Sequence, residues 1–199
     1  VEMCQGLPLT IVILAGILAN MDRSGWKEEV QSLSLRNVSS TEQCTTALEL
    51  SYKHLPDNLK SCYLYFGGFP EDHEHTVKRL IWLWVTEGFV QATDLKSAED
   101  VANDYMMDLI NRSLVMVSKQ RSIGGVKTCR IHDLLHEFCV KNAKEENFLQ
   151  LVRGYDELYT LNVQHYLHRL CINSTTKDFN ESRLAFPTIR CQLFFAQGT

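Results

Sequence analysis

The feature that most limits the fold of this chain is one hairpin signal set among helical segments. Residues 114–120 (LVMVSKQ) and 126–131 (VKTCRI) are predicted to form two short strands, and Gly124-Gly125 stands in the link between them. A Gly-Gly pair supplies the backbone freedom that a tight hairpin turn needs. Helical patterns lie on both sides, so the sequence predicts a mainly α chain with a small β-hairpin.

Helical periodicity is clearest just before the hairpin, in residues 97–115. Ser97 is a capping residue, and Asp100 three positions later makes this start close to a capping box. Apolar side chains then recur at four-residue spacing, as in an amphipathic helix. The same reasoning predicts four further helices, at residues 41–55, 59–69, 75–90 and 132–148. The inner face of the last one is expected to carry Leu134, Leu135, Phe138 and Cys139.

Helices followed by a hairpin and a last helix make a winged-helix arrangement, which we place at residues 59–150. This fold serves both DNA-binding and protein-binding proteins, so it does not decide the function. Residues 1–58 are expected to be the end of a helical subdomain. The apolar run from Leu9 to Met21 favours a helix, buried on all sides, that begins at Pro8, although its β-branched residues leave a strand as the alternative.

The tail, residues 151–199, is predicted to be a linker and the first leucine-rich-repeat strands. An L-x-x-L-x-L pattern returns as a similar alternation about 21 residues later, within the 20–29 residues of such repeats. Its positions are Leu167, Leu170 and Ile172, then Ile189, Cys191 and Leu193. Two unrelated strands are the alternative. An array needs about three repeats for stability, so we expect this chain to be part of a larger protein.

Composition indicates an ordered protein that does not bind nucleic acid over its whole surface. The hydrophobic fraction is 45% and the net charge is −4. Seven cysteines, with no C-x-x-C pair, indicate reduced thiols inside a cell. The apolar run near the start has about fifteen residues, fewer than the ~20 that span a bilayer.

Residues 129–139 gather side chains that can bind metals or transfer protons. Their C-x2-H-x3-H-x2-C spacing would suit zinc, with Cys129, His132, His136 and Cys139 as ligands. Burial in the core is the commoner role of such cysteines. A metal-dependent phosphohydrolase is a weaker interpretation, because its further ligands are missing and HDLLH lacks the glutamate of H-E-x-x-H.

Nucleic-acid binding is a further alternative, because the hairpin is basic. Residues 118–130 contain four cations and no acid, namely Lys119, Arg121, Lys127 and Arg130. A DNA-binding winged helix also needs a recognition helix with polar side chains for the base edges. The candidate at residues 77–89 carries large apolar residues instead, and a solvated basic hairpin is the simpler interpretation.

His132 can also be interpreted as a sensor of bound phosphate, because it precedes a helix. Free N–H groups and the macrodipole attract anions to helix N-termini. We expect Asp133 to cap this helix, the imidazole to reach toward the phosphate and Arg130 to raise the local potential. A surface histidine without a ligand remains the alternative.

Four segments in the right order resemble the plant nucleotide-binding (NB-ARC), leucine-rich-repeat disease-resistance proteins. Residues 4–18 contain the GLPL motif, and residues 47–73 resemble the segment that precedes the winged helix. LIWLWVTEGFV resembles the next block, and RIHDLLHEF is similar to the Met-His-Asp motif with Ile131 in place of Met. The resemblance spans residues 1–150 and favours the coiled-coil, late-blight-resistance-like class.

This resemblance implies an intracellular immune switch that ADP holds closed and ATP opens. It implies that Pro8 and Leu9 contact the adenine and that His132 contacts the terminal phosphate of ADP. Gly6 and Leu7 would support the first site. Asp133 and Arg130 would support the second.

The resemblance also sets expectations for chemistry and partners. No G-x-x-x-x-G-K-[ST] phosphate loop occurs in the 199 residues, so we expect no enzyme activity and negligible ADP or ATP binding by this chain alone. Expected partners are the missing nucleotide-binding domain, the protein's own leucine-rich repeats, a pathogen effector or host guardee, and further copies on activation. Neither nucleic acid nor membrane contact is expected. The expected location is the cytoplasm, with nuclear or membrane-associated pools, and a nucleic-acid-binding winged helix is the rival function.

Overall fold

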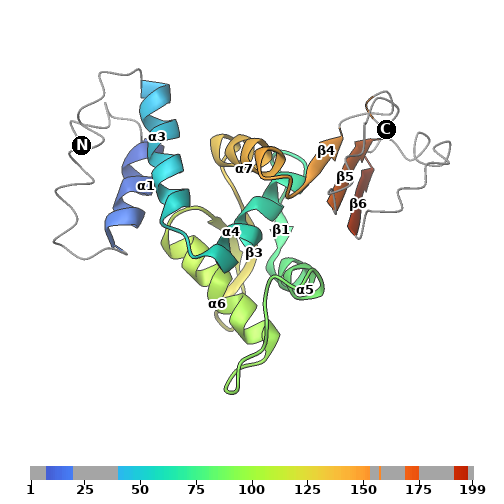
Figure 1. Cartoon of the computed structure of the whole chain (residues 1–199). Helices are drawn as coiled ribbons and strands as arrows, with labels where there is room; N and C mark the ends of the chain where they lie inside the picture. The colour runs from blue at the N-terminus through green and yellow to red at the C-terminus, as the bar shows by residue number, and fades with distance from the viewer. Residues whose placement is uncertain (1–7, 20–39, 153–156, 158–168, 175–190, 197–199) are drawn as a thin grey trace. The chain divides into compact units, whose positions relative to one another are not determined.

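The computed structural model describes residues 8–19, 40–152, 157, 169–174 and 191–196 (Figure 1). The chain forms two compact units, residues 1–60 with 74–131 and residues 61–73 with 132–199. The first unit contains α1 (Pro8–Ala19), α3 (Ser40–Lys53), β1 (His75–Thr76), α5 (Val77–Thr86), α6 (Ala98–Asn111), β2 (Met116–Gln120) and β3 (Val126–Arg130). The second contains the 3-10 helix η2 (Tyr65–Gly68), α7 (Asp133–Glu145), β4 (Gln150–Val152), β5 (Arg169–Ser174) and β6 (Cys191–Ala196), and α4 (Asp57–Leu64) belongs partly to each.

The expected mainly α fold with a small hairpin is confirmed. β2 and β3 pair antiparallel, and β1 adds a third strand in the order β1-β3-β2. Sequence analysis missed β1, which has two residues and pairs His75 with Cys129. A strand of two residues is too short to show alternation, so only its pairing reveals it.

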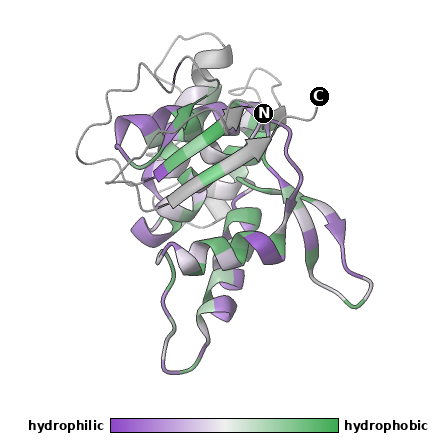
Figure 2. Ribbon diagram, turned by 90° about the vertical axis from the view of Figure 1, so that its right-hand side faces the viewer, coloured by the Kyte–Doolittle hydropathy of each residue, from purple (hydrophilic) through white to green (hydrophobic). Residues whose placement is uncertain are grey.

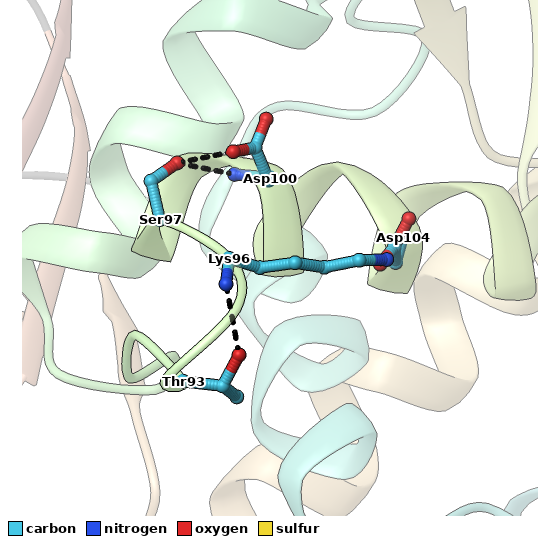
Figure 3. A network of polar contacts seen from close by, with 5 residues as sticks. All are labelled: Thr93, Lys96, Ser97, Asp100 and Asp104. Atoms are coloured by element: carbon cyan, nitrogen blue, oxygen red, sulfur yellow. Dashed lines mark hydrogen bonds and ion pairs between the residues drawn. The ribbon is translucent and has the colours of Figure 1, made fainter.

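The start of α6 confirms the predicted cap. The hydroxyl of Ser97 accepts a hydrogen bond from the Asp100 N–H and donates one, 2.7 Å long, to the Asp100 carboxylate. Lys96 bonds to Thr93 before the helix and to Asp104 within it (Figure 3). These bonds satisfy N–H groups that a helix start leaves unpaired, and they order the turn that leads into α6.

α1 begins at Pro8 as expected, but it is not buried on all sides. Ile13 and Gly16 are buried, whereas Val12 is 45% exposed and Ala15 is exposed. A Cβ on Gly16 would lie 2.4 Å from the carbonyl oxygen of Arg112, the C-cap residue of α6. Only one face of α1 therefore packs against its unit, and on that face two backbones meet without a side chain between them.

In the second unit, η2 packs closely on α7. All four residues of η2 are buried, and a Cβ on Gly67 would lie 2.9 Å from backbone atoms of Cys139 and Val140. Leu135, Phe138 and Cys139 form the buried face of α7, as expected. Leu134 is 38% exposed, so its assignment to that face was wrong. His136 is buried instead, because it lies three residues before Cys139 on the packed side of the helix.

The tail forms a parallel sheet in the order β4-β5-β6. Arg169 pairs with Cys191, 22 residues later, and Gln150 pairs with Leu170. β5 is buried at Leu170, Cys171 and Ile172. Leu167 and Ile189 lie outside the described residues. The two expected strands are therefore present and pair directly in parallel.

Candidate functional site at the start of α7

His132 is the N-cap of α7, a role that we expected of Asp133. The imidazole Nδ1 accepts a hydrogen bond of 3.3 Å from the Leu134 N–H. The carbonyl of His132 accepts 2.9 Å bonds from the N–H groups of Leu135 and His136. Asp133 is instead the first helical residue and is exposed, where its charge favours the helix macrodipole.

This cap fixes the protonation pattern of the imidazole. Because Nδ1 of His132 accepts a hydrogen bond, the neutral ring carries its proton on Nε2. No hydrogen bond among the described residues occupies Nε2. The ring is half-buried. His132 can therefore hold the helix start with one nitrogen and donate to a ligand with the other.

Of the two residues just before His132, Ile131 is buried and Arg130 is exposed. Ile131, at the position of the motif's Met, is 7% exposed. Isoleucine and methionine are both apolar and can both fill such a buried position, so we expect Ile in place of Met to be tolerated. Arg130 is exposed at the end of β3, and its charge helps to lower the pKa of Glu74.

The GLPL residues belong to the other unit. Pro8 is the first residue of α1, and Leu9 is half-buried. Gly6 and Leu7 lie outside the described residues. Pro8 and Leu9 fall in the first unit and His132 in the second, so the structure describes the two halves of the expected nucleotide contact separately.

The four ligands of the alternative zinc site have other roles. His136 bonds through Nε2 to the carbonyl of Phe69 at 2.8 Å, and the Cys139 thiol donates to the carbonyl of Tyr63. Burial raises the pKa of Cys139, and it raises that of Cys129 to about 12. Within the described ranges, no three His, Cys, Asp or Glu residues form a metal-binding group. These thiols are protonated core residues.

The helix that precedes the hairpin is acidic. In a helix-turn-helix the second helix reads the bases, and here that helix is α6, not the segment at 77–89 that the sequence suggested. Its exposed residues include Glu99, Asp100 and Asp104. Carboxylates at this position repel phosphates, which argues against duplex DNA as a ligand.

Sequence analysis also missed Glu74, which links β1 to the hairpin. Its carboxylate accepts hydrogen bonds from Thr128 (2.6 Å) and Lys119 (2.9 Å). These bonds, with the charges of Lys119 and Arg130, hold the pKa of Glu74 below its usual value. No signal in the sequence marks this residue, because Glu74 lies 45 residues before Lys119 and stands beside two other acids, Glu71 and Asp72.

Comparison with known families identifies the domain. A family model for the winged-helix domain of disease resistance proteins matches residues 69–139. Residues 69–139 are a disease-resistance winged helix. The hairpin and the residues up to Cys139 fall inside this match, and the resemblance found in the sequence is thereby confirmed.

Plant resistance proteins align with most of the chain that carries this disease-resistance winged helix. It is 44% identical over 151 residues to a late blight resistance protein homolog of Solanum demissum, in an alignment that covers 74% of the chain. It is 43% identical, over 76% of the chain, to the disease resistance RPP13-like protein 3 of Arabidopsis thaliana. The aligned part makes up 12% of the first relative and 18% of the second.

The search for membrane-spanning helices covered the described residues. None of the helices there combines the length and the hydrophobicity that a bilayer requires.

Proposed function

We propose that this chain is the regulatory part of an intracellular plant immune receptor that ADP and ATP switch. In the off state the winged helix clamps ADP, and exchange for ATP opens the receptor and starts the defence response, including hypersensitive cell death. Pro8 and Leu9 would lie against the adenine, and His132 would bind the terminal phosphate. An upstream nucleotide-binding domain would supply the phosphate loop, and the chain itself would not be an enzyme.

The observation that carries this proposal is the double role of His132. One imidazole nitrogen caps α7, and the other is a donor beside a helix N-terminus. That helix end attracts negative charge through its dipole. A phosphate that meets this end would find the Nε2–H beside the positive end of the helix dipole.

Such a contact is strong enough to bias a switch. A hydrogen bond to a charged group contributes roughly 1.5–3 kcal/mol. If it forms only in the closed state, it shifts the ratio of closed to open receptor about 10- to 150-fold. His132 alone would then decide much of the retention of ADP.

We also propose that β5 and β6 belong to the leucine-rich repeats of this receptor. Their parallel pairing with an offset of 22 residues supports this, because leucine-rich repeats stack one strand per 20–29 residues. In the proposal these repeats, a pathogen effector or host guardee, and further copies on activation are the protein partners.

Two substitutions at His132 separate the phosphate contact from the cap. In the full-length receptor, His132→Asn keeps a good capping side chain but shortens the reach, whereas His132→Ala removes both. We expect both variants to release bound ADP about 10- to 150-fold faster, as measured with fluorescent ADP. Only His132→Ala should also lose about 1 kcal/mol of stability.

Asp133→Asn is the matched control, because it changes the neighbouring charge and leaves the imidazole in place. We expect it to change ADP release far less than either His132 variant. If His132→Asn retained ADP like the wild type while His132→Ala did not, His132 would be a cap and nothing more, and the clamp proposal would fail.

A further inference from the structure

The tip of the β2–β3 hairpin is a fully exposed turn of the first unit. Residues 121–125 are all exposed, and Ile123 is 97% exposed. Two backbone bonds, Arg121 N–H to the Gly125 carbonyl and Gly124 N–H to the Arg121 carbonyl, close the turn. In Figure 2 the hairpin projects from its surroundings. Ser122 therefore stands at the end of a protruding loop.

The hydroxyl of Ser122 makes no hydrogen bond among the described residues. Some other exposed hydroxyls of the same unit do form hydrogen bonds: Thr86 donates to carbonyls within α5, Thr93 accepts from Lys96, and Ser97 caps α6. A serine without a structural role can be modified without loss of a native bond. Ser122 is such a residue.

Cations precede Ser122 in the chain. Lys119 lies three residues before it and Arg121 one residue before it, and both are exposed. Lys127 faces solvent on the paired strand. One class of protein kinase selects substrates by such charge patterns, because acidic groups in its groove bind cations N-terminal to the serine.

The pairing of β2 with β3 near the tip can also open with a small loss of free energy. The pairing of β2 with β3 shifts register between Val117 and Lys119 and again between Lys119 and Gln120. Such irregular pairing, exposed and followed by two glycines, opens more readily than a regular ladder. A kinase groove that takes an extended segment could therefore bind residues 119–123.

We propose that Ser122 is a phosphorylation site for a serine/threonine kinase that selects basic residues before the serine. The Oγ of Ser122 attacks the γ-phosphorus of ATP, the bond from that phosphorus to the bridging oxygen breaks, and ADP leaves. The hydroxyl proton passes to the base of the kinase. This proposal is independent of the nucleotide switch proposed above.

The added phosphate changes the charge of the hairpin. Phosphoserine carries about −1.5 to −2 charges at neutral pH and accepts strong hydrogen bonds. Arg121, Lys127 and Lys119 are the nearest cations in the hairpin. Because Lys119 now bonds to Glu74, the phosphate competes with that carboxylate, and phosphorylation should loosen the link between the hairpin and β1.

The test uses the purified chain, ATP and a calcium-dependent plant kinase of this basic-directed class. Tandem mass spectrometry should find the phosphate on Ser122, and Ser122→Ala should abolish it. Ser118 is the matched control: it is exposed on the same hairpin but follows four apolar residues, so Ser118→Ala should leave incorporation unchanged. Arg121→Gln should slow incorporation at least ten-fold.

A synthetic peptide with the sequence VSKQRSIGG shows whether the kinase recognises the local sequence without the folded hairpin. We expect both peptide and protein to be phosphorylated. The proposal would be overturned by phosphorylation of the peptide but not the folded protein, by phosphorylation of neither, or by equal incorporation into the Ser122→Ala protein.

Discussion

Two regions of the molecule are stabilised differently: the contact between η2 and α7, and the hairpin of β2 and β3. In the first, four buried residues meet a helix backbone with no space for a methyl group. In the second, most side chains face solvent, and one exposed carboxylate, that of Glu74, binds side chains of both hairpin strands. Packing therefore holds the first region in place, and charge and hydrogen bonding shape the second.

This difference predicts how each region responds to change. A close-packed contact cannot accept extra atoms without moving backbone, so small substitutions there should have large effects on stability. Exposed ion pairs contribute little to stability. Substitutions in the hairpin should therefore change binding, modification and pH response more than the free energy of unfolding.

Gly67→Ala should have the largest effect on stability. The new Cβ would lie 2.9 Å from the carbonyl carbon of Cys139 and from the nitrogen of Val140. Neither backbone atom can turn away, so we expect a loss of about 3 kcal/mol, the upper end for overpacked positions. Chemical denaturation followed by circular dichroism would measure it.

Gly68→Ala is the control that sharpens this result. Its Cβ would meet side-chain atoms, at 2.6 Å from the Cys171 Sγ and 3.0 Å from the Leu149 Cδ1. Cys171→Ala should therefore restore part of the stability lost in Gly68→Ala. The same substitution should not rescue Gly67→Ala. Equal rescue of both, or a neutral Gly67→Ala, would contradict the packing described for η2 and α7.

Gly16→Ala should have the next largest effect on stability, because a gain in helix propensity offsets part of the cost of overpacking. Alanine favours a helix interior over glycine by about 1 kcal/mol. The Cβ would also lie 2.4 Å from the carbonyl oxygen of Arg112, and overpacking typically costs about 1–3 kcal/mol. We expect a net loss of up to about 2 kcal/mol, with faster hydrogen exchange in α1.

A double variant that exchanges Ala15 and Gly16 isolates the cost of the added Cβ at position 16. Ala15 is exposed in the same helix, so the double variant Ala15→Gly, Gly16→Ala keeps the composition and nearly the helix propensity of α1. We expect it to be less stable than the wild type by about the full overpacking cost. A stabilised Gly16→Ala protein would show that α1 does not approach α6 so closely.

Sequence patterns predicted the longer elements because each has a long enough signal. The helix at α6 showed both a cap and a four-residue period, and the hairpin showed two strands around Gly124-Gly125. β1 has two residues and so had no period to detect. The exposure of Val12 and Leu134 was also missed, because an apolar residue can face solvent when the partner helix covers only one side.

The candidate site was predictable in its residues and not in its geometry. The motif around His132 predicted the right helix end. Capping preferences favoured Asp133 as the cap, because aspartate is the commoner capping residue. The structure gives that role to His132, whose backbone has the extended conformation of a cap, with φ −74° and ψ 148°. Only the backbone conformation decides between two adjacent capping candidates, and sequence does not supply it.

Glu74→Gln should have the smallest effect on stability and the clearest pH dependence. Hydrogen bonds from Thr128 and Lys119 keep the pKa of Glu74 below its ordinary value of 4.5. A carboxyl group with a depressed pKa stabilises the fold above its unfolded pKa, and this contribution is lost as the pH falls through the folded value. The wild type should therefore exceed Glu74→Gln in stability at pH 7, and the difference should be lost as the pH falls below 4.5 and through the lower pKa of the folded state. Thermal unfolding of both proteins across this range measures it, with Glu71→Gln, which removes another exposed carboxylate nearby in the chain, as the control for the loss of one negative charge. A difference that stayed constant down to low pH would mean that Glu74 acts through packing, and the contrast between the charged hairpin and the packed helix would lose its basis.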